Sequence, residues 1–181
     1  MTGFEMLFAF YSLMLGLALA NATTGFANVW RSREGAAIGT LVPLLCLVVV
    51  TYVPSQWLGF WVNRDVFTLT PFLLLTAMAV ILPYVFLSQA MFPERPERWR
   101  TLDDYVLANA AMILGPLLIA PVIAVTVNLI YGSREWVEPS LRVLLTLALP
   151  VAMIWRPRLW LHRVGLAGMI AFNLFRLFNR A

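Results

Sequence analysis

The sequence has 181 residues, of which 61% are hydrophobic and 12% are charged. Soluble domains average roughly 45–50% apolar and about 25% charged residues, so this balance excludes an ordinary soluble domain. The formal net charge of +4 comes from thirteen arginines and nine acidic residues, and lysine is absent. The arginines stand in short segments between apolar stretches, which indicates a role in membrane orientation and argues against nucleic-acid binding.

Four long stretches carry no charged residue: 6–30, 35–63, 66–93 and 105–133. Each exceeds the roughly 20 residues with which an α-helix crosses a hydrocarbon core of about 30 Å. A soluble core of this size has no room for four helices that are apolar on every face. The sequence therefore predicts an all-α, polytopic bundle of transmembrane helices that forms a single domain over residues 1–181.

The first expected span covers residues 4–30 and carries two sets of residues at helical spacing. One set is a face of small side chains, on which another helix backbone can approach closely. It consists of Ser12, Gly16 and Ala20. The other set is a narrow polar stripe, consisting of Asn21, Thr24 and Asn28. We expect each set to be a helix-packing surface, with a polar path as the alternative for the stripe.

The second expected span covers residues 36–53, and Pro54 either ends it or kinks it on its way to residue 62. The third covers residues 66–91 and contains Pro83, whose freed carbonyl a neighbouring helix can satisfy. The loop that follows is the most charged part of the chain and ends in Asp103 and Asp104. We expect this pair to stabilise the positive end of the next helix dipole and not to form a catalytic dyad.

The fourth expected span covers residues 105–131, with Asn109 near its start. Pro116 and Pro121 lie inside it and predict a kink or a locally loosened helix in mid-membrane. The fifth covers residues 140–155. The last segment, residues 159–178, is apolar enough to insert, so we favour six spans. The alternative is five spans followed by a C-terminal helix that lies in the interface.

Tryptophan and arginine positions predict how the bundle sits in the membrane. All seven tryptophans fall at or near the ends of the expected spans, as at the headgroup level of a bilayer. The connections after the first, third and fifth spans hold most of the arginines, so the positive-inside rule places them in the cytoplasm and the N-terminus outside, in the periplasm. Six spans would put Arg176 and Arg180 outside, against this rule, whereas five spans would keep both inside.

Missing residue types exclude several chemistries. Without lysine there can be no retinal Schiff base, and the single His162 cannot supply paired axial ligands to a haem. Cys46 and His162 alone cannot assemble a zinc site, which needs three or four ligands. The carboxylates all fall at the ends of spans or in loops, which disfavours ion-coupled transport. We expect no cofactor, no metal and no catalytic residue, and an interfacial position for His162 between Arg158 and Arg163.

Three local features suggest a relationship. They are the apolar run 13–20 ahead of Arg31, the pair Trp57 and Trp61 after the second span, and Phe92-Pro93 at the end of the third. Together they resemble a group of small uncharacterised bacterial multi-span proteins, over about the first half to two-thirds of the chain. The resemblance implies an α-helical bundle in the bacterial inner membrane and brings no activity, cofactor or catalytic residue with it.

Three functions fit this inventory. The first, which we favour, is a non-catalytic membrane subunit or scaffold that packs in the lipid bilayer against a second copy or against other membrane proteins. The second is a passive oligomeric channel or small-solute permease, lined by Asn21, Thr24, Asn28 and Asn109. The third is an enzyme that acts on lipid at the membrane interface through Asp103, Asp104 or His162.

Overall fold

The computed structural model describes residues 3–31, 37–62, 64, 70–123, 126 and 137–178, with residues 137–145 described by their backbone alone. In chain order these ranges contain α1 (Gly3–Arg31), α2 (Leu41–Val62), α3 (Pro71–Ala90), the 3-10 turn η1 (Pro96–Arg98), α4 (Leu102–Ala108), α5 (Ala110–Leu114), the 3-10 turn η2 (Gly115–Leu118), α7 (Val137–Trp155) and α8 (Leu159–Phe178). They contain no strand, and the one β-like contact among them is an isolated parallel bridge between Ala37 and Thr101.

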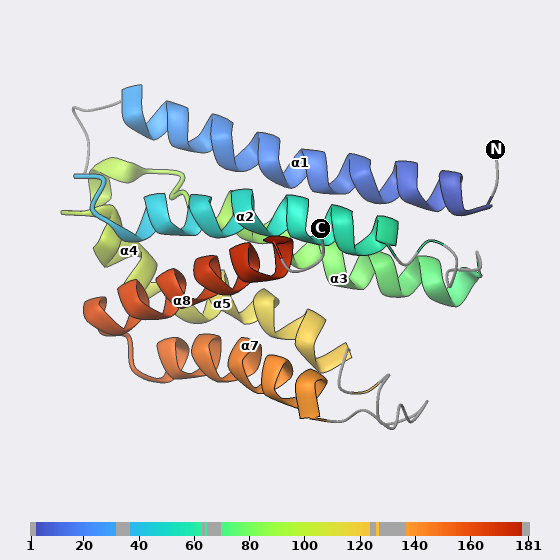
Figure 1. The fold of residues 1–181 in the computed structure, drawn as a ribbon. Helices are drawn as coiled ribbons and strands as arrows, with labels where there is room; N and C mark the ends of the chain where they lie inside the picture. Colours follow the sequence, from blue (N-terminus) through green and yellow to red (C-terminus); the bar gives the residue numbers. More distant parts are fainter. Residues whose placement is uncertain are drawn as a thin grey trace.

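The helices form an all-α bundle in which successive long elements run in alternate directions along one axis (Figure 1). Within the described residues, α1, α2 and α3 are long and apolar enough to cross a membrane, and the bent α4–α5 segment makes a fourth if it counts as one span. An all-α bundle with three to four candidate spans is therefore established. Six spans remain a prediction.

The three long helices pack against one another, and their ends follow from local sequence. α1 packs on both α2 and α3, and α2 also packs on α8. α2 continues through Pro54 to Val62, so this proline does not end the helix. α3 starts at Pro71 after Thr70, whose hydroxyl accepts a bond from the amide of Leu73 at 3.1 Å. A hydroxyl N-cap followed by proline is a strong start signal. The residues 66–69 of the third expected span lie outside the described residues.

The fourth expected span is broken into differently directed pieces. The axis turns by 77° between residues 102–108 and 110–123, at Asn109. Asn109 leaves the helical conformation (φ −111°, ψ 22°), and its side-chain amide donates to the carbonyl of Tyr105 at 2.9 Å. Asparagine competes with helical bonding in this way. The kink expected at the prolines therefore lies earlier in the chain. Around Pro116 the helix is loosened into the 3-10 turn η2.

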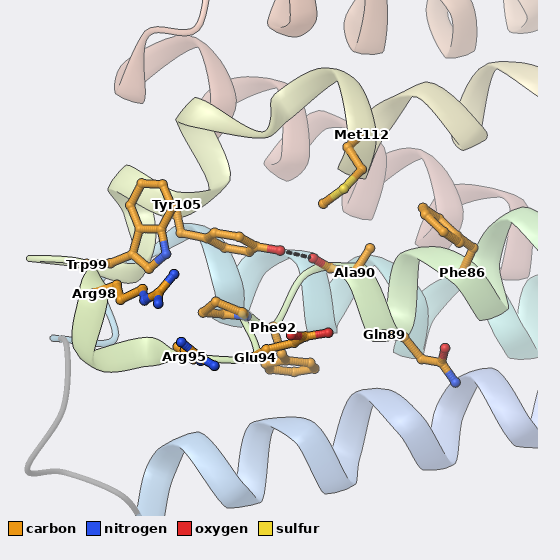
Figure 2. Close-up of a pocket in the computed structure, with 11 residues that line it drawn as sticks. Phe86, Gln89, Ala90, Phe92, Glu94, Arg95, Arg98, Trp99, Tyr105 and Met112 are labelled. Atoms are coloured by element: carbon orange, nitrogen blue, oxygen red, sulfur yellow. Dashed lines mark hydrogen bonds between the residues drawn. The ribbon is translucent and has the colours of Figure 1, made fainter.

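The short helix α4 is tied to the end of α3. The hydroxyl of Tyr105 donates a hydrogen bond of 2.7 Å to the carbonyl of Ala90, in the last turn of α3 (Figure 2). This bond satisfies a helix-terminal carbonyl that has no partner within its own helix. It also holds α4 across the end of the bundle, at a steep angle to the helix that follows.

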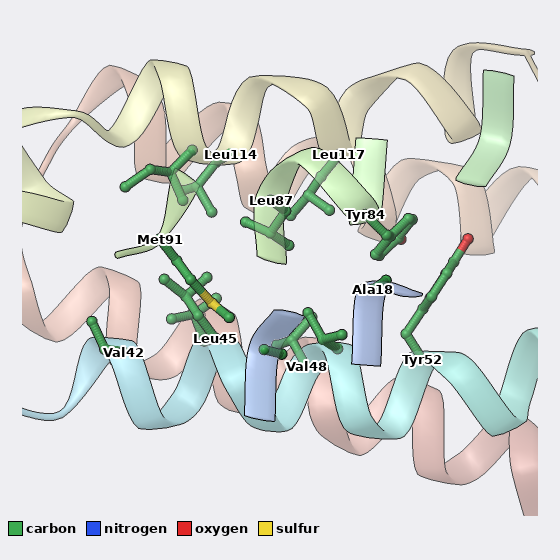
Figure 3. Close-up of a cluster of buried hydrophobic side chains, with 14 of the residues drawn as sticks. Ala18, Val42, Leu45, Val48, Tyr52, Tyr84, Leu87, Met91, Leu114 and Leu117 are labelled. Carbon is green, nitrogen blue, oxygen red and sulfur yellow. The ribbon is translucent and has the colours of Figure 1, made fainter. Parts of the chain in front are cut away.

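The core extends from α1 and α2 across α3 to the α5–η2 segment. Figure 3 shows part of it, with side chains from all of these elements: Ala18, Leu45, Val48, Leu87, Met91, Leu114 and Leu117. Ala18 and Ala22 are fully buried on α1. At Gly25, further along the same helix, a Cβ would overlap the ring of Phe92. Small residues at these places let the helices approach closely, which stabilises packing in lipid through van der Waals contact.

Large apolar side chains also cover the outside of the bundle. Leu13, Phe72 and Leu75 are each more than 60% exposed. Large exposed apolar side chains lie on all the long helices, and a soluble protein rarely exposes so many. This surface suits a protein whose outer faces contact hydrocarbon.

The C-terminal helices form an antiparallel pair. α7 and α8 are joined by Arg156-Pro157-Arg158, and α8 packs on both α7 and α2. Figure 1 shows α8 lying alongside α2 in the direction of the bundle.

Candidate functional site

A buried carboxylate connects the start of α2 to the start of α4. Asp103 is 7% exposed, and its Oδ1 accepts hydrogen bonds from the backbone amides of Thr40 at 2.8 Å and Leu41 at 2.7 Å. Its Oδ2 accepts from the hydroxyl of Thr40 at 3.2 Å. Asp103 therefore caps a helix that begins 62 residues earlier in the chain. We call this group, Thr40, Leu41 and Asp103, the Asp103 clasp.

The surroundings of the Asp103 clasp reinforce it from three sides. Gly39 has a positive φ of 67°, and a Cβ there would overlap the carboxylate, so glycine suits both the backbone and the space. The amide of Leu102 donates to the carbonyl of Ala37 at 2.9 Å. Arg163 of α8 donates from Nε to the hydroxyl of Thr40 at 2.8 Å, which brings a positive charge close to the buried negative one. Together with Arg163, the clasp joins α2, α4 and α8 at one end of the bundle.

The two aspartates have different partners. Asp104 forms a capping box with Thr101 at the start of its own helix, as expected for a carboxylate near a helix N-terminus. Asp103 stabilises the N-terminus of α2 instead. A charge pattern along one segment identifies a capping role, but it cannot reveal which helix a carboxylate caps.

The side chain of His162 is enclosed by the protein, and its interfacial position remains a prediction. Its side chain is 0% exposed, and its Nδ1 lies 3.1 Å from the carbonyl of Arg158 in the preceding turn. Its Nε2 has no hydrogen-bond partner. The imidazole is enclosed because α8 packs on both α2 and α7. This tertiary contact cannot be predicted from the flanking arginines.

A groove of about 840 Å³ lies beside the clasp, between the end of α3, the loop that follows it and the α4–α5 segment. Its lining residues carry both apolar and charged side chains: Phe86, Gln89, Ala90, Phe92, Pro93, Glu94, Arg95, Arg98, Trp99, Tyr105 and Met112. The charged residues gather in the loop, toward Trp99, whereas Phe86 and Met112 lie at the other end (Figure 2). Trp99 packs edge-on against Tyr105 at 5.4 Å between ring centroids, which steadies the loop end. Sequence reasoning did not identify this groove.

The residues of the expected polar stripe differ in exposure. Asn21 is half-buried and its amide nitrogen has no partner, while Thr24 and Asn28 are exposed. Asn109 lies at the break between α4, which packs on α2, and α5, which packs on α3 and α7, whereas the stripe lies on α1. A path lined by all four residues remains a prediction.

The small-residue face of α1 points away from the rest of the chain. Gly16 and Ala20 are exposed, and a Cβ at Gly16 would meet no atom within 4 Å. Ser12 is the exception, since its hydroxyl accepts a 3.1 Å bond from the indole nitrogen of Trp57. Within the chain, α1 packs through Ala18, Ala22 and Gly25 instead. A role for the outer face in contacts with another chain remains a prediction.

Among the described residues there is no group of three or more His, Cys, Asp or Glu that could hold a metal ion. Cys46 is a free thiol, half-buried, with Sγ 3.9 Å from the carbonyl of Ala22.

The fold and these sites define a class, an all-α bundle whose long helices are apolar enough to cross a membrane. No protein-family model matches the chain, and no curated protein or solved structure is significantly similar to it.

The Asp103 clasp makes a direct prediction about stability. Asp103→Ala leaves the buried amide of Leu41 and the part-buried amide of Thr40 without acceptors, and a buried donor left unpaired costs about 1–3 kcal/mol. We expect a loss of roughly 2–4 kcal/mol, measured by reversible unfolding in mixed detergent micelles. Glu97→Ala removes an exposed carboxylate at the same end of the bundle and should change little. Equal effects of the two substitutions would contradict the capping role.

Proposed function

We propose that this protein is a non-catalytic membrane subunit. The observation that carries the proposal is the Asp103 clasp. An enzyme at the interface would need this carboxylate free, whereas here it accepts hydrogen bonds from three donors of Thr40 and Leu41. Asp104 is likewise engaged in its capping box, and His162 is enclosed. An acid–base catalyst must reach its substrate's proton within hydrogen-bonding distance. Asp103 joins two helices, Asp104 caps its own helix and His162 is enclosed, which supports a structural role for all three.

The outer face of α1 supports association with another membrane-embedded chain. Because Gly16 and Ala20 have small side chains or none, the backbone of this face is accessible, and the exposed apolar side chains of Leu13 and Leu17 flank it. In lipid, helices associate where small residues allow the backbones to approach. A second copy of the chain is the partner that we propose for the purified protein.

A bulky residue at Gly16 should therefore weaken self-association and leave the monomer intact. Overpacking costs about 1–3 kcal/mol at a close interface, so Gly16→Leu should raise the dissociation constant by about tenfold or more. The intrachain fold should tolerate it, because nothing lies within 4 Å of the added Cβ. Leu17→Ile keeps the bulk of a neighbouring exposed residue and serves as the control.

Native mass spectrometry in mild detergent, together with cross-linking in liposomes, measures the oligomeric state. A monomeric wild-type protein under both conditions would rule out the homo-oligomer. Equal weakening by Gly16→Leu and Leu17→Ile would place the interface on a different face.

We further propose that the arginine-rich end faces the cytoplasm of a bacterial cell and that the N-terminus is periplasmic. Because the helices alternate in direction, the end of α1, the loop after α3 and the α7–α8 connection lie at the same end of the bundle (Figure 1). That end carries Arg31, Arg95, Arg98, Arg100, Arg156 and Arg158. The positive-inside rule supports this orientation.

Single cysteines in a Cys46→Ala background test the orientation. Arg64→Cys should react with an impermeant thiol reagent in intact cells, and Arg100→Cys should react only after permeabilisation. The reverse pattern would overturn the orientation. A cysteine at Ala181, outside the described residues, should be labelled from outside for six spans and only after permeabilisation for five.

A passive channel is the second candidate, favoured by buried polar groups inside the bundle. The hydroxyl of Ser55 on α2 and the amide nitrogen of Asn21 on α1 have no hydrogen-bond partner. An unsatisfied polar group is costly in an apolar interior unless water reaches it.

Solute and ion flux into liposomes separates the two candidates. For a subunit that only packs, purified protein should give no flux above that of empty liposomes. Asn21→Leu should not lower stability, because it removes a buried amide nitrogen that has no partner. A reproducible flux that Asn21→Leu abolishes would replace our first proposal with the channel.

A further inference from the structure

The groove beside the Asp103 clasp has two chemically different ends. Phe86 of α3 and Met112 of α5 line one end and are 48% and 44% exposed on the outside of their helices. Arg95, Arg98 and Trp99 line the other end, in the loop beyond the last turn of α3 (Figure 2). The apolar end therefore opens onto a surface that contacts hydrocarbon, and the charged end lies just beyond the helices.

The charged end has an excess of positive charge with no internal partner. The described part of the chain provides no hydrogen bond and no ion pair to the guanidinium groups of Arg95 and Arg98, both of which are exposed. Glu94 is the one acidic residue in the lining, so the two arginines leave a net charge of about +1. Guanidinium groups match the oxygens of a phosphate with paired, charge-assisted hydrogen bonds. Tryptophan beside them is typical of the headgroup level of a bilayer.

We propose that this groove binds an anionic phospholipid, with the phosphodiester at Arg95 and Arg98 and an acyl chain along Phe86 and Met112. The groove volume of about 840 Å³ lies within the range of about 300–1,000 Å³ that ligand sites occupy. A free phosphate would use only the charged end. A zwitterionic lipid with an ammonium group would need Glu94 as its partner. The positive excess together with the lateral apolar opening favours the anionic lipid.

The site is formed by the way α4 is held. Tyr105 lines the groove and bonds to the carbonyl of Ala90, so the wall between α3 and α4 has a fixed position. On the other side, the ring of Phe92 lies against Gly25 of α1 and cannot move in that direction. The groove thus has walls fixed by packing, and the two arginines at its mouth retain free side chains. A preformed apolar cleft with a few convergent polar groups is the usual form of a ligand site.

Lipid titration followed by native mass spectrometry tests the proposal on the full-length protein in detergent. The probes are phosphatidylglycerol, phosphatidylcholine and phosphatidylethanolamine with the same acyl chains, and inorganic phosphate as a competitor. We expect phosphatidylglycerol to bind with at least tenfold preference over phosphatidylcholine, since one charge-assisted bond can account for about that factor. The double variant Arg95→Gln, Arg98→Gln should lose this preference.

Matched variants separate the site from general charge. Arg100→Gln removes an exposed arginine of the same loop that does not line the groove, and it should keep the preference for phosphatidylglycerol within about twofold. Met112→Trp fills the apolar end and should weaken binding of the full lipid while leaving that of inorganic phosphate unchanged. Thermal unfolding of each variant confirms that the fold is retained; all four side chains are exposed.

Four results would overturn the proposal. The first is equal binding of phosphatidylglycerol and phosphatidylcholine by the wild-type protein. The second is an equal loss for Arg100→Gln and the double variant, which would indicate a diffuse charge effect. The third is full displacement by inorganic phosphate at millimolar concentration, which would indicate a phosphate site alone. The last is a preference for phosphatidylethanolamine that Glu94→Gln abolishes, which would indicate a zwitterionic lipid.

Discussion

A carboxylate buried at the end of an apolar bundle is tolerated only when donors surround it, because removing a charge from water costs several kcal/mol. Asp103 meets this condition with the amides of Thr40 and Leu41, the hydroxyl of Thr40 and, through that hydroxyl, Arg163. The same contacts satisfy amides that the first turn of α2 cannot pair internally. The amides thus offset the cost of burying the carboxylate, and the carboxylate offsets the cost of burying unpaired amides. The same contacts hold three helices together.

The position of α4 follows from this constraint. With Asp103 held at α2 and Tyr105 bonded to Ala90, α4 has to lie across the end of the bundle. The chain can enter the bundle again only by turning, and the 77° bend at Asn109 provides the turn. The bend separates the loop after α3 from α5, and the groove lies in that separation. One buried interaction thus determines both the packing of this end and the presence of an amphipathic cleft there.

The sequence predicts the all-α bundle well and the contacts within it poorly, for a physical reason. Charge-free length marks a helix that can enter lipid, so α1, α2 and α3 are evident from composition. Yet α2 and α3 are apolar on nearly every side, and in lipid an outward leucine is as suitable as an inward one, so no periodicity identifies the buried face. Small residues do not identify the buried face of α1 either: Gly16 is exposed, whereas Ala18 and Ala22 are buried. The capping role of Asp104 is local and could be predicted; the partner of Asp103 is 62 residues away and could not.

Polar residues therefore specify the arrangement of a bundle whose apolar residues cannot. The clasp aligns α2, α4 and α8, the Tyr105 bond aligns α4 with α3, and Asn173 of α8 donates to the hydroxyl of Thr51 on α2 at 3.3 Å. Two of these three contacts lie at the arginine-rich end, on either side of the loop that carries Arg95 and Arg98. A ligand that binds both arginines would contact a loop whose two ends are held by these contacts. A ligand that binds only the folded arrangement of this loop stabilises that arrangement. Occupancy of the groove and stability of this end of the bundle are therefore thermodynamically coupled.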